Sequence, residues 1–214
     1  MDFVDILFEK RNGVATLTLN RPDRLNSLTT EMYRELSNIL RQINRDDEIK
    51  VVILTGAGRG FCSGSDVSER LASRAERGIE ENRFETIQQI GAVALDIDDL
   101  DKLIIAAING VAVGAELSLA LLCDIRIASD QARFGAVWIN VGLIPDLGAT
   151  YYLPRIVGLE KATELMLSGE IINADEAMRI GLVSKVVPND QLMGEVIGLA
   201  DKIAAGPSIA IELT

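Results

Sequence analysis

Apolar residues recur along this chain with two different periods. Short runs of Val, Ile and Leu predict buried strands at residues 50–55, 103–108, 122–128 and 183–187. An apolar residue at every third or fourth position predicts helices at residues 30–45, 148–157, 160–168, 174–180 and 190–204. Buried strands that alternate with helices indicate an α/β layer fold.

The ends of the chain refine this picture. Residues 6–8 and 14–19 flank a polar turn that ends in Gly13, which predicts a hairpin, and Thr29 or Thr30 can cap the helix that follows. Residues 67–100 are charged at first and amphipathic later, which favours a helical segment near a site and then a packed helix. We expect a core domain at residues 1–188 and the start of a C-terminal helical region at residues 189–214.

Composition narrows the classes of function. With 214 residues and 48% hydrophobic content, the chain can bury a sizeable core. A net charge of −11 opposes general attraction to nucleic acid and to anionic membranes. The sequence contains no histidine, which excludes an imidazole base, a Ser-His triad and a His-ligated zinc ion for the chain as given.

The first residues of the sequence and its two cysteines indicate the cellular compartment. The first residues have neither the basic start nor the apolar run of a signal peptide, and no apolar stretch reaches spanning length. Cys62 and Cys123 lie in different segments without metal-ligand spacing, so we expect buried thiols in a reducing setting. These features predict a cytoplasmic protein.

Two glycine-containing segments can carry chemistry. Residues 55–66, TGAGRGFCSGSD, form a turn after a buried strand, where backbone amides can point at a ligand. Residues 108–129, INGVAVGAELSLALLCDIRIAS, read as strand, turn, helix and strand. The start of that helix, with Gly114 and Ala115, leaves amides free at a positive dipole end that suits a developing oxyanion. Each segment alone is also compatible with a purely structural turn or helix.

Taken together, these segments resemble the two oxyanion loops of the enoyl-CoA hydratase/isomerase (crotonase) superfamily. Three flanking motifs agree with the resemblance: NRPDRLNSLT, ARFGAVWINVGLIPDLGATYYLPRIVG and LMLSGEIINADEAMRIGLVSKVV. The resemblance implies a crotonase-like β-β-α superhelix that binds coenzyme A thioesters and assembles as a homotrimer or hexamer. Family members usually continue beyond residues 207–214, so we expect a truncated chain.

The resemblance also assigns roles to individual residues. It implies that the amides of Ser63 and Ala115 form the oxyanion hole, and that the pocket for the acyl-CoA substrate includes further residues around them. It places Arg24 near the CoA phosphates, which a guanidinium suits, although an exposed turn arginine needs no such role. The remaining substrate-binding candidates are Gly64, Ser65, Asp66, Gly114 and Ser118.

The acidic residues distinguish this chain from typical hydratases. Those enzymes carry two glutamates that position water, and the matching positions here are Ser118 and Trp138. Glu116 lies two positions before Ser118, roughly 200° around a helix, and we expect it to face elsewhere. Asp146 stands where isomerases of the superfamily carry a proton-shuttling acid, although a Pro-Asp pair is also common in turns.

These residues predict an enoyl-CoA double-bond isomerase in which Asp146 moves a proton between carbons and Trp138 lines the site, with no cofactor beyond the coenzyme A of the substrate. The alternatives are an enoyl-CoA hydratase or hydrolase that uses Asp146 alone, and a noncatalytic oligomeric scaffold. Trp138 and Asp146 also resemble the aryl-CoA dehalogenases of the superfamily, but those enzymes use a histidine and this sequence has none.

Overall fold

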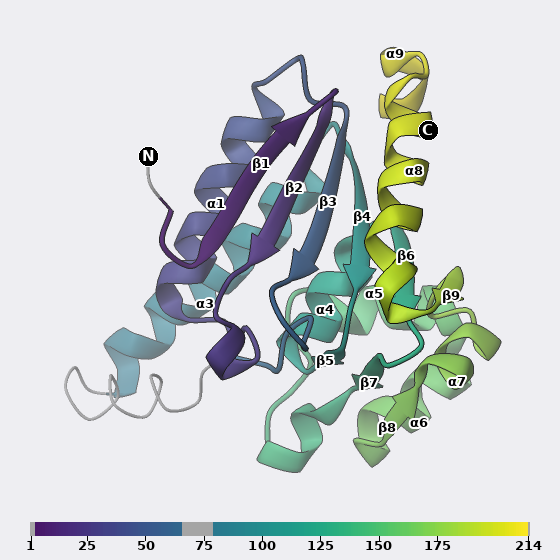
Figure 1. Ribbon diagram of the computed structural model, residues 1–214. Coiled ribbons are helices and arrows are strands. Elements are labelled where there is room, and N and C mark those ends of the chain that lie inside the picture. The colour runs from purple at the N-terminus through teal and green to yellow at the C-terminus, as the bar shows by residue number, and fades with distance from the viewer. Residues whose placement is uncertain (1–2, 66–78, 214) are drawn as a thin grey trace.

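The computed structural model describes residues 3–65 and 79–213, and its centre is a six-stranded sheet (Figure 1). The strands lie in the order β1-β2-β3-β4-β6-β9, where β1 and β2 are antiparallel and all other neighbours are parallel. Their bounds are β1 Ile6–Arg11, β2 Val14–Leu19, β3 Val51–Gly56, β4 Leu103–Ile108, β6 Ile125–Ser129 and β9 Lys185–Val187. The predicted α/β fold is confirmed.

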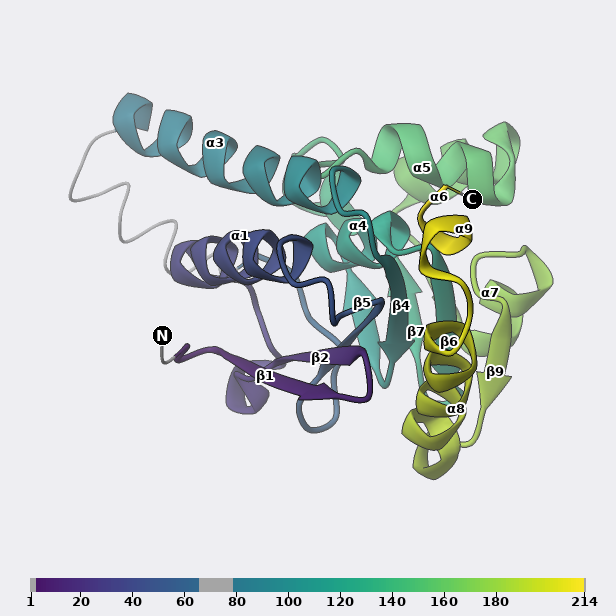
Figure 2. The ribbon, with the colours of Figure 1, turned by 90° about the horizontal axis from the view of Figure 1, so that it is seen from above.

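Helices cover both faces of this sheet, as the view from above shows (Figure 2). One face carries α1 (Thr30–Asn44), α3 (Ile79–Asp98) and α4 (Ala115–Leu122), and the other carries α8 (Leu192–Ala204). Along β3, Val52 and Leu54 pack in the core on the side of α1, α3 and α4, whereas Val51 and Ile53 pack in the core on the side of α8. The run at residues 50–55 is therefore apolar throughout, because successive side chains on a strand point to opposite and equally buried faces.

A second, smaller sheet lies below the carboxyl ends of the parallel strands (Figure 1). It joins β5 (Val111–Val113), β7 (Arg133–Gly135) and β8 (Ile171–Asn173) in the order β5-β7-β8. These strands have three residues each, too few for a recognisable period, so the hydrophobic pattern did not predict them. The remaining helices are η1 Pro22–Arg24, η2 Val137–Val141, α5 Ala149–Val157, α6 Leu159–Ser168, α7 Ala174–Arg179, η3 Asn189–Gln191 and α9 Ser208–Glu212.

Several predicted boundaries shift by a few residues. The first strand runs on to Arg11, so that only Asn12 and Gly13 form the hairpin turn, both with positive φ. Leu122 ends α4 instead of starting a strand. The predicted domain boundary at residue 188 falls just before η3 and α8, and α8 packs on the large sheet. None of the described helices has the length and apolarity that crossing a membrane requires.

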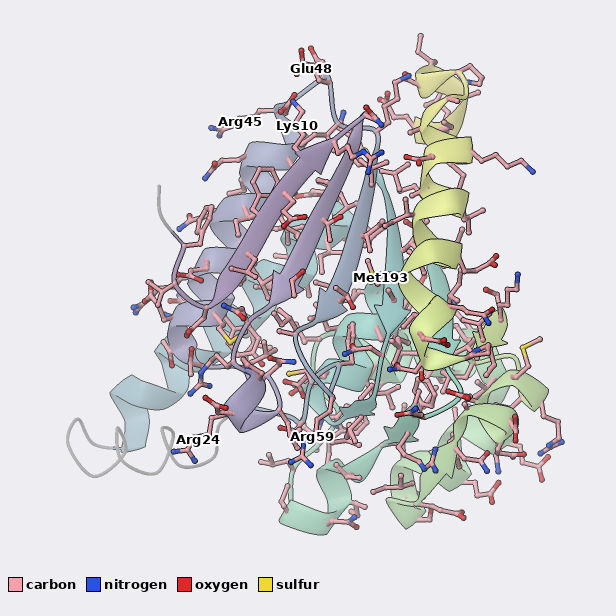
Figure 3. The ribbon with its side chains drawn as sticks, viewed as in Figure 1. Lys10, Arg24, Arg45, Glu48, Arg59 and Met193 are labelled. Atoms are coloured by element: carbon pink, nitrogen blue, oxygen red, sulfur yellow. The ribbon has the colours of Figure 1, made fainter. Side chains whose placement is uncertain are left out.

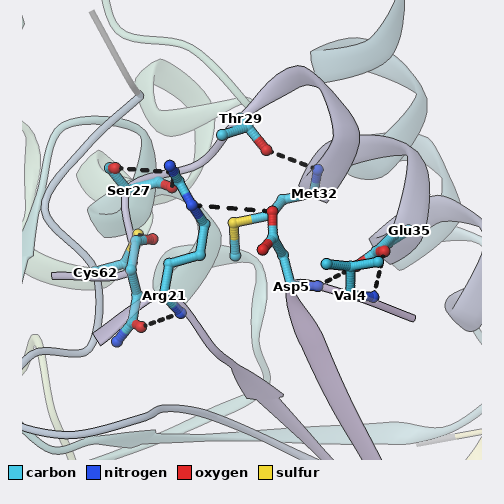
Figure 4. Close-up of polar contacts among 9 residues, drawn as sticks. Val4, Asp5, Arg21, Ser27, Thr29, Met32, Glu35 and Cys62 are labelled. Carbon is cyan, nitrogen blue, oxygen red and sulfur yellow. Dashed lines mark hydrogen bonds and ion pairs between the residues drawn. The ribbon is translucent and has the colours of Figure 1, made fainter. Parts of the chain in front are cut away.

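The segment between β2 and α1 is held by a set of polar contacts (Figure 4). Thr29 caps α1, accepting a hydrogen bond from the Met32 amide at 3.1 Å. Arg21 donates to the Ser27 carbonyl at 2.6 Å and forms an ion pair with Asp5 at 3.9 Å. These contacts bring the start of α1 beside the end of β2, where the first glycine-containing loop also passes.

Asn26 ties this segment to that loop. It is fully buried, accepts a hydrogen bond from the Arg21 amide at 2.9 Å and directs its side-chain amide at the carbonyls of Ala57, Gly60 and Phe61. Replacement of Asn26 with alanine should lower the free energy of unfolding by about 3 kcal/mol, because buried carbonyls lose their donor. Urea denaturation at pH 7 measures the loss.

Two further variants sharpen this prediction. Asn26→Asp should cost more than Asn26→Ala, because a carboxylate would face several carbonyl oxygens. Asn44→Ala serves as the control, since Asn44 is only partly buried and bonds to the backbone of Asp99 and Asp101 at the surface. Equal losses at positions 26 and 44 would contradict a special role for the buried amide.

Candidate active site

The two glycine-containing segments meet at the carboxyl ends of the parallel strands. Residues 62–65, here called the first loop, are tethered on both sides: the Cys62 amide donates to the Val111 carbonyl at 2.8 Å, and the Leu28 amide donates to the Gly64 carbonyl at 3.0 Å. Gly64 has a φ of +110°, which side-chain-bearing residues rarely adopt. The tethers place the first loop directly beside β5 and the start of α4.

The structure brings the two predicted oxyanion donors to this junction. Ala115 is the first residue of α4, so its amide has no partner within the helix. Gly114 turns the chain into the helix with a φ of 63° and donates to the Gly135 carbonyl at 3.0 Å. Within the described residues, the amides of Ser63 and Ala115 donate no hydrogen bond to an oxygen atom. Two backbone amides beside a helix amino terminus form a suitable site for a negatively charged oxygen.

Asp146 lies next to this junction, held by the two residues at the hydratase glutamate positions. Ser118 Oγ donates to Asp146 Oδ1 at 2.8 Å, and Trp138 Nε1 donates to the same oxygen at 3.3 Å. Ser118 and Trp138 are buried, whereas Asp146 is partly exposed. The carboxyl group therefore has a fixed orientation and is partly accessible. Its catalytic role stays a prediction.

Glu116 lies on another face of α4. Ser118, and not Glu116, bonds Asp146, so Glu116 does not replace the hydratase glutamate on that face of α4. The Glu116 side chain is fully buried, and its Oε2 lies 3.6 Å from the point where a Cβ on Gly64 would stand. Its carboxyl group thus lies against the first loop. Helical spacing correctly placed Glu116 and Ser118 on different faces of α4. It did not reveal that both faces are buried in the folded protein.

Burial dominates the electrostatics of the groups around the first loop. It raises the pKa of Glu116 to about 8, and it raises the pKa values of the Cys62 thiol and the Tyr33 hydroxyl well above their ordinary values. Tyr33 and Ser65 share a hydrogen bond at 3.2 Å between their hydroxyl oxygens. At neutral pH these groups are therefore neutral, and the wall behind the first loop carries little charge.

The other predicted binding residues fall into two groups. Ser63, Gly64, Ser65 and Gly114 lie at the junction, whereas Asp66 lies outside the described residues. Arg24 is exposed in η1, and its carbonyl accepts a hydrogen bond from Ser63 Oγ at 3.3 Å, which joins η1 to the first loop. Arg59, which the sequence analysis did not single out, points outward at the same end of the molecule (Figure 3).

The two cysteines are buried and form no disulfide, which confirms the expectation of ordinary thiols. Cys62 begins the first loop, and Cys123 caps α4 at its carboxyl end. Both thiols have pKa values raised by burial, that of Cys123 to about 12. A thiol that stays protonated is a poor nucleophile, so neither cysteine is suited to covalent catalysis.

Comparison with known proteins gives consistent results. A family model described as enoyl-CoA hydratase/isomerase matches residues 9–214. A short-chain-enoyl-CoA hydratase from Clostridium acetobutylicum is 39% identical, over all of this chain and 80% of the relative. A 1,2-epoxyphenylacetyl-CoA isomerase from Escherichia coli is 40% identical, over 97% of this chain and 79% of the relative. The crystal structure of an enoyl-CoA hydratase from Bacillus anthracis superposes with a TM-score of 0.92 at 39% identity, covering 98% of this chain and 80% of that one.

Proposed function

The chain belongs to the enoyl-CoA hydratase/isomerase family, and from this premise we propose that it moves a carbon–carbon double bond along an enoyl-CoA thioester. The observation that carries the proposal is the surroundings of Asp146. By resemblance, Ser118 and Trp138 stand where typical hydratases carry their two water-positioning glutamates. Here both residues donate hydrogen bonds to Asp146, which leaves one oriented carboxyl group on that side of the site.

One such group is enough for a 1,3-proton shift. The carboxylate of Asp146 removes a proton from C2 of a 3-enoyl thioester, and the electron pair of that C–H bond becomes a dienolate whose charge lies on the thioester oxygen. The amides of Ser63 and Ala115 donate hydrogen bonds to this oxygen. Asp146 then returns the proton to C4, and the double bond moves from C3–C4 to C2–C3.

The balance of this reaction requires nothing beyond the substrate and the protein. C2 loses one proton and C4 gains one, the protonated Asp146 can exchange with solvent between the two steps, and no electrons leave the substrate. We therefore propose that the enzyme uses no redox cofactor or metal, and that coenzyme A enters only as the carrier of the acyl group. We assign the CoA phosphates to Arg24, which is exposed next to the first loop and whose guanidinium suits phosphate geometry.

Two assays separate the candidate reactions. Incubation of 3-hexenoyl-CoA with the protein in deuterium oxide should produce 2-hexenoyl-CoA that carries deuterium, detected by mass spectrometry. Incubation with crotonyl-CoA should leave the ultraviolet absorbance of the conjugated thioester almost unchanged. Rapid loss of this absorbance, with no migration in the first assay, would instead establish a hydratase. Inactivity in both assays would favour the noncatalytic scaffold.

Hydration remains the second candidate because of the relatives. The Clostridium acetobutylicum relative is named a short-chain-enoyl-CoA hydratase, while the Escherichia coli relative is named an isomerase. In a hydratase of this sequence, Asp146 alone would both activate water and supply the proton to C2. Water addition usually requires two positioned acid–base groups, which makes the proton shift the better match to the geometry.

The two residues that hold Asp146 provide a test of its orientation. Ser118→Ala and Trp138→Phe should each lower kcat for double-bond migration about tenfold with KM nearly unchanged, because each removes one hydrogen bond that orients the base. The double variant should lose less than the product of the two factors, since both bonds reach the same oxygen.

Ser129→Ala is the matched control for these variants. Ser129 is another fully buried serine, and its hydroxyl forms hydrogen bonds with its neighbours Asp130 and Gln131. This variant should keep the parent's kcat. A higher KM with unchanged kcat in Ser118→Ala would contradict the positioning role and assign Ser118 to substrate binding.

A further inference from the structure

Glu116 is a buried acid that the proposed proton shift does not use. It lies in the first turn of α4, immediately after Ala115, and its side chain has no exposed surface. Neither carboxyl oxygen has a hydrogen bond of normal geometry among the described residues, although the Cys62 thiol and the Leu28 amide lie near enough to lower the pKa of Glu116. Burying a carboxyl group without strong hydrogen bonds costs free energy, and this one lies between the first loop and the start of α4.

The position of the carboxyl group is well defined by its neighbours. Its Oε2 lies 3.6 Å from the point where a Cβ on Gly64 would stand, so the carboxyl group faces the middle of the first loop. Gly64 and Ser63 are adjacent, and Ala115 and Glu116 are adjacent. The carboxyl group therefore packs behind the junction at which the two predicted oxyanion donors meet.

We propose that Glu116 is a positioning residue of this site: its uncharged carboxyl group packs against Gly64, supports the first loop and keeps negative charge away from the oxyanion hole. The role as stated rests on the proposed enolate chemistry. A charged Glu116 would compete with the substrate oxyanion for the positive amino terminus of α4, and it would repel the enolate.

The groups that face Glu116 come from several elements. Asp146 precedes α5 and raises the pKa of Glu116, in the same direction as the dominant effect of burial. Cys62 of the first loop and the amide of Leu28 act in the opposite direction. Tyr33 of α1 also faces the carboxyl group and is itself neutral at pH 7 because burial raises its pKa. The net pKa near 8 leaves Glu116 protonated at neutral pH.

The pH dependence of catalysis tests the proposal. Between pH 7 and pH 9.5 the parent's kcat for double-bond migration should fall roughly thirtyfold, as expected for one group titrating near pH 8 whose ionised form is inactive. Glu116→Gln keeps the shape without the titration, so its kcat should be similar to the parent's at pH 7 and stay nearly constant up to pH 9.5.

A second buried glutamate supplies the matched control. Glu35 of α1 accepts hydrogen bonds from the amides of Val4 and Asp5 and bonds no residue of the first loop among the described contacts (Figure 4). Glu35→Gln should therefore show the same alkaline fall as the parent. An unchanged fall in Glu116→Gln would overturn the proposal, and so would loss of its activity at every pH, which would assign Glu116 a direct proton-transfer role.

A binding measurement separates this proposal from the proposed function. The enolate of acetoacetyl-CoA absorbs in the ultraviolet, and its binding needs the oxyanion hole but no turnover. At pH 9.5 the parent should bind this enolate roughly thirtyfold more weakly than Glu116→Gln, while at pH 7 the two should bind it similarly. Comparison at one pH cancels the ionisation of the ligand itself. Equal affinities at pH 9.5 would overturn the role of Glu116 even if no isomerase activity were found.

Thermal unfolding gives a readout independent of any ligand. The pKa of Glu116 is about 8 in the folded protein and near the ordinary 4.5 in the unfolded chain. A raised folded-state pKa contributes stability that is fully present below pH 4.5 and is lost as the pH rises through 8. The parent should therefore lose more stability between pH 5 and pH 8 than Glu116→Gln does. Parallel curves would show that Glu116 is already ionised, which would overturn the proposal.

Discussion

Replacement of Asp146 with asparagine should lower kcat for double-bond migration by about 10²- to 10⁴-fold, while acyl-CoA binding persists. An amide cannot take up the proton from C2, yet it has the size of the carboxyl group. Its Oδ1 can still accept the hydrogen bonds from Ser118 and Trp138. The variant therefore removes proton transfer and leaves the architecture around it intact.

Three measurements on this variant define the outcome. Migration of the double bond and deuterium uptake from solvent should both disappear, whereas the dissociation constant of a saturated acyl-CoA should stay within a few-fold of the parent's value. Asp98→Asn is the control, because Asp98 is exposed at the end of α3 and accepts a hydrogen bond from the Tyr152 hydroxyl at 3.1 Å. Unchanged turnover in Asp146→Asn would return Asp146 to the role of a turn residue.

The second large effect concerns a backbone amide. Ala115→Pro should lower kcat by about 10²- to 10³-fold, because it removes one of the two proposed donors to the enolate oxygen. Ala115 is the first residue of α4, a helical position where proline costs no intrahelical hydrogen bond and fits the backbone angle. The helix should therefore form in the variant, and only the site should lose its donor.

Ala115→Gly is the matched control for the proline variant, since it keeps the amide while changing the same side chain. It should retain activity within a few-fold of the parent. Far-ultraviolet circular dichroism and the binding of free coenzyme A should report folded protein for both variants. Comparable rates for Ala115→Pro and Ala115→Gly would show that the enolate oxygen is bound elsewhere.

Two carboxyl groups with opposite surroundings face this site. Asp146 is partly exposed and accepts two hydrogen bonds, which suit a charged carboxylate. Glu116 is fully buried and accepts none among the described residues. Such a difference in environment is a general means by which one site holds a base and a neutral acid at the same pH. The proposed assignment of base to Asp146 and neutral support to Glu116 follows this division.

Local patterns in the sequence were sufficient for the main elements. The apolar run at residues 50–55 is long enough and pure enough to identify a strand buried on both faces, and β3 spans Val51–Gly56. The helix predicted from residue 30 begins there, because Thr29 supplies a capping hydroxyl whose effect is local. The strands that escaped prediction, β5, β7 and β8, have three residues each, lack a longer apolar run such as the one that ends in β9, and depend on pairing partners distant in the chain.

The sequence by itself determined the family, the α/β fold and the residue types available for chemistry. These are the glycine-containing loops, the acid Asp146 shortly after η2, and the absence of histidine. Only the tertiary structure decided how these residues act on one another. Ser118 and Trp138 bond the same oxygen of Asp146 although 20 positions separate them, and Glu116 packs on Gly64 from another segment. Such contacts depend on distances across the folded core and on burial from every side, which no periodicity within one segment encodes.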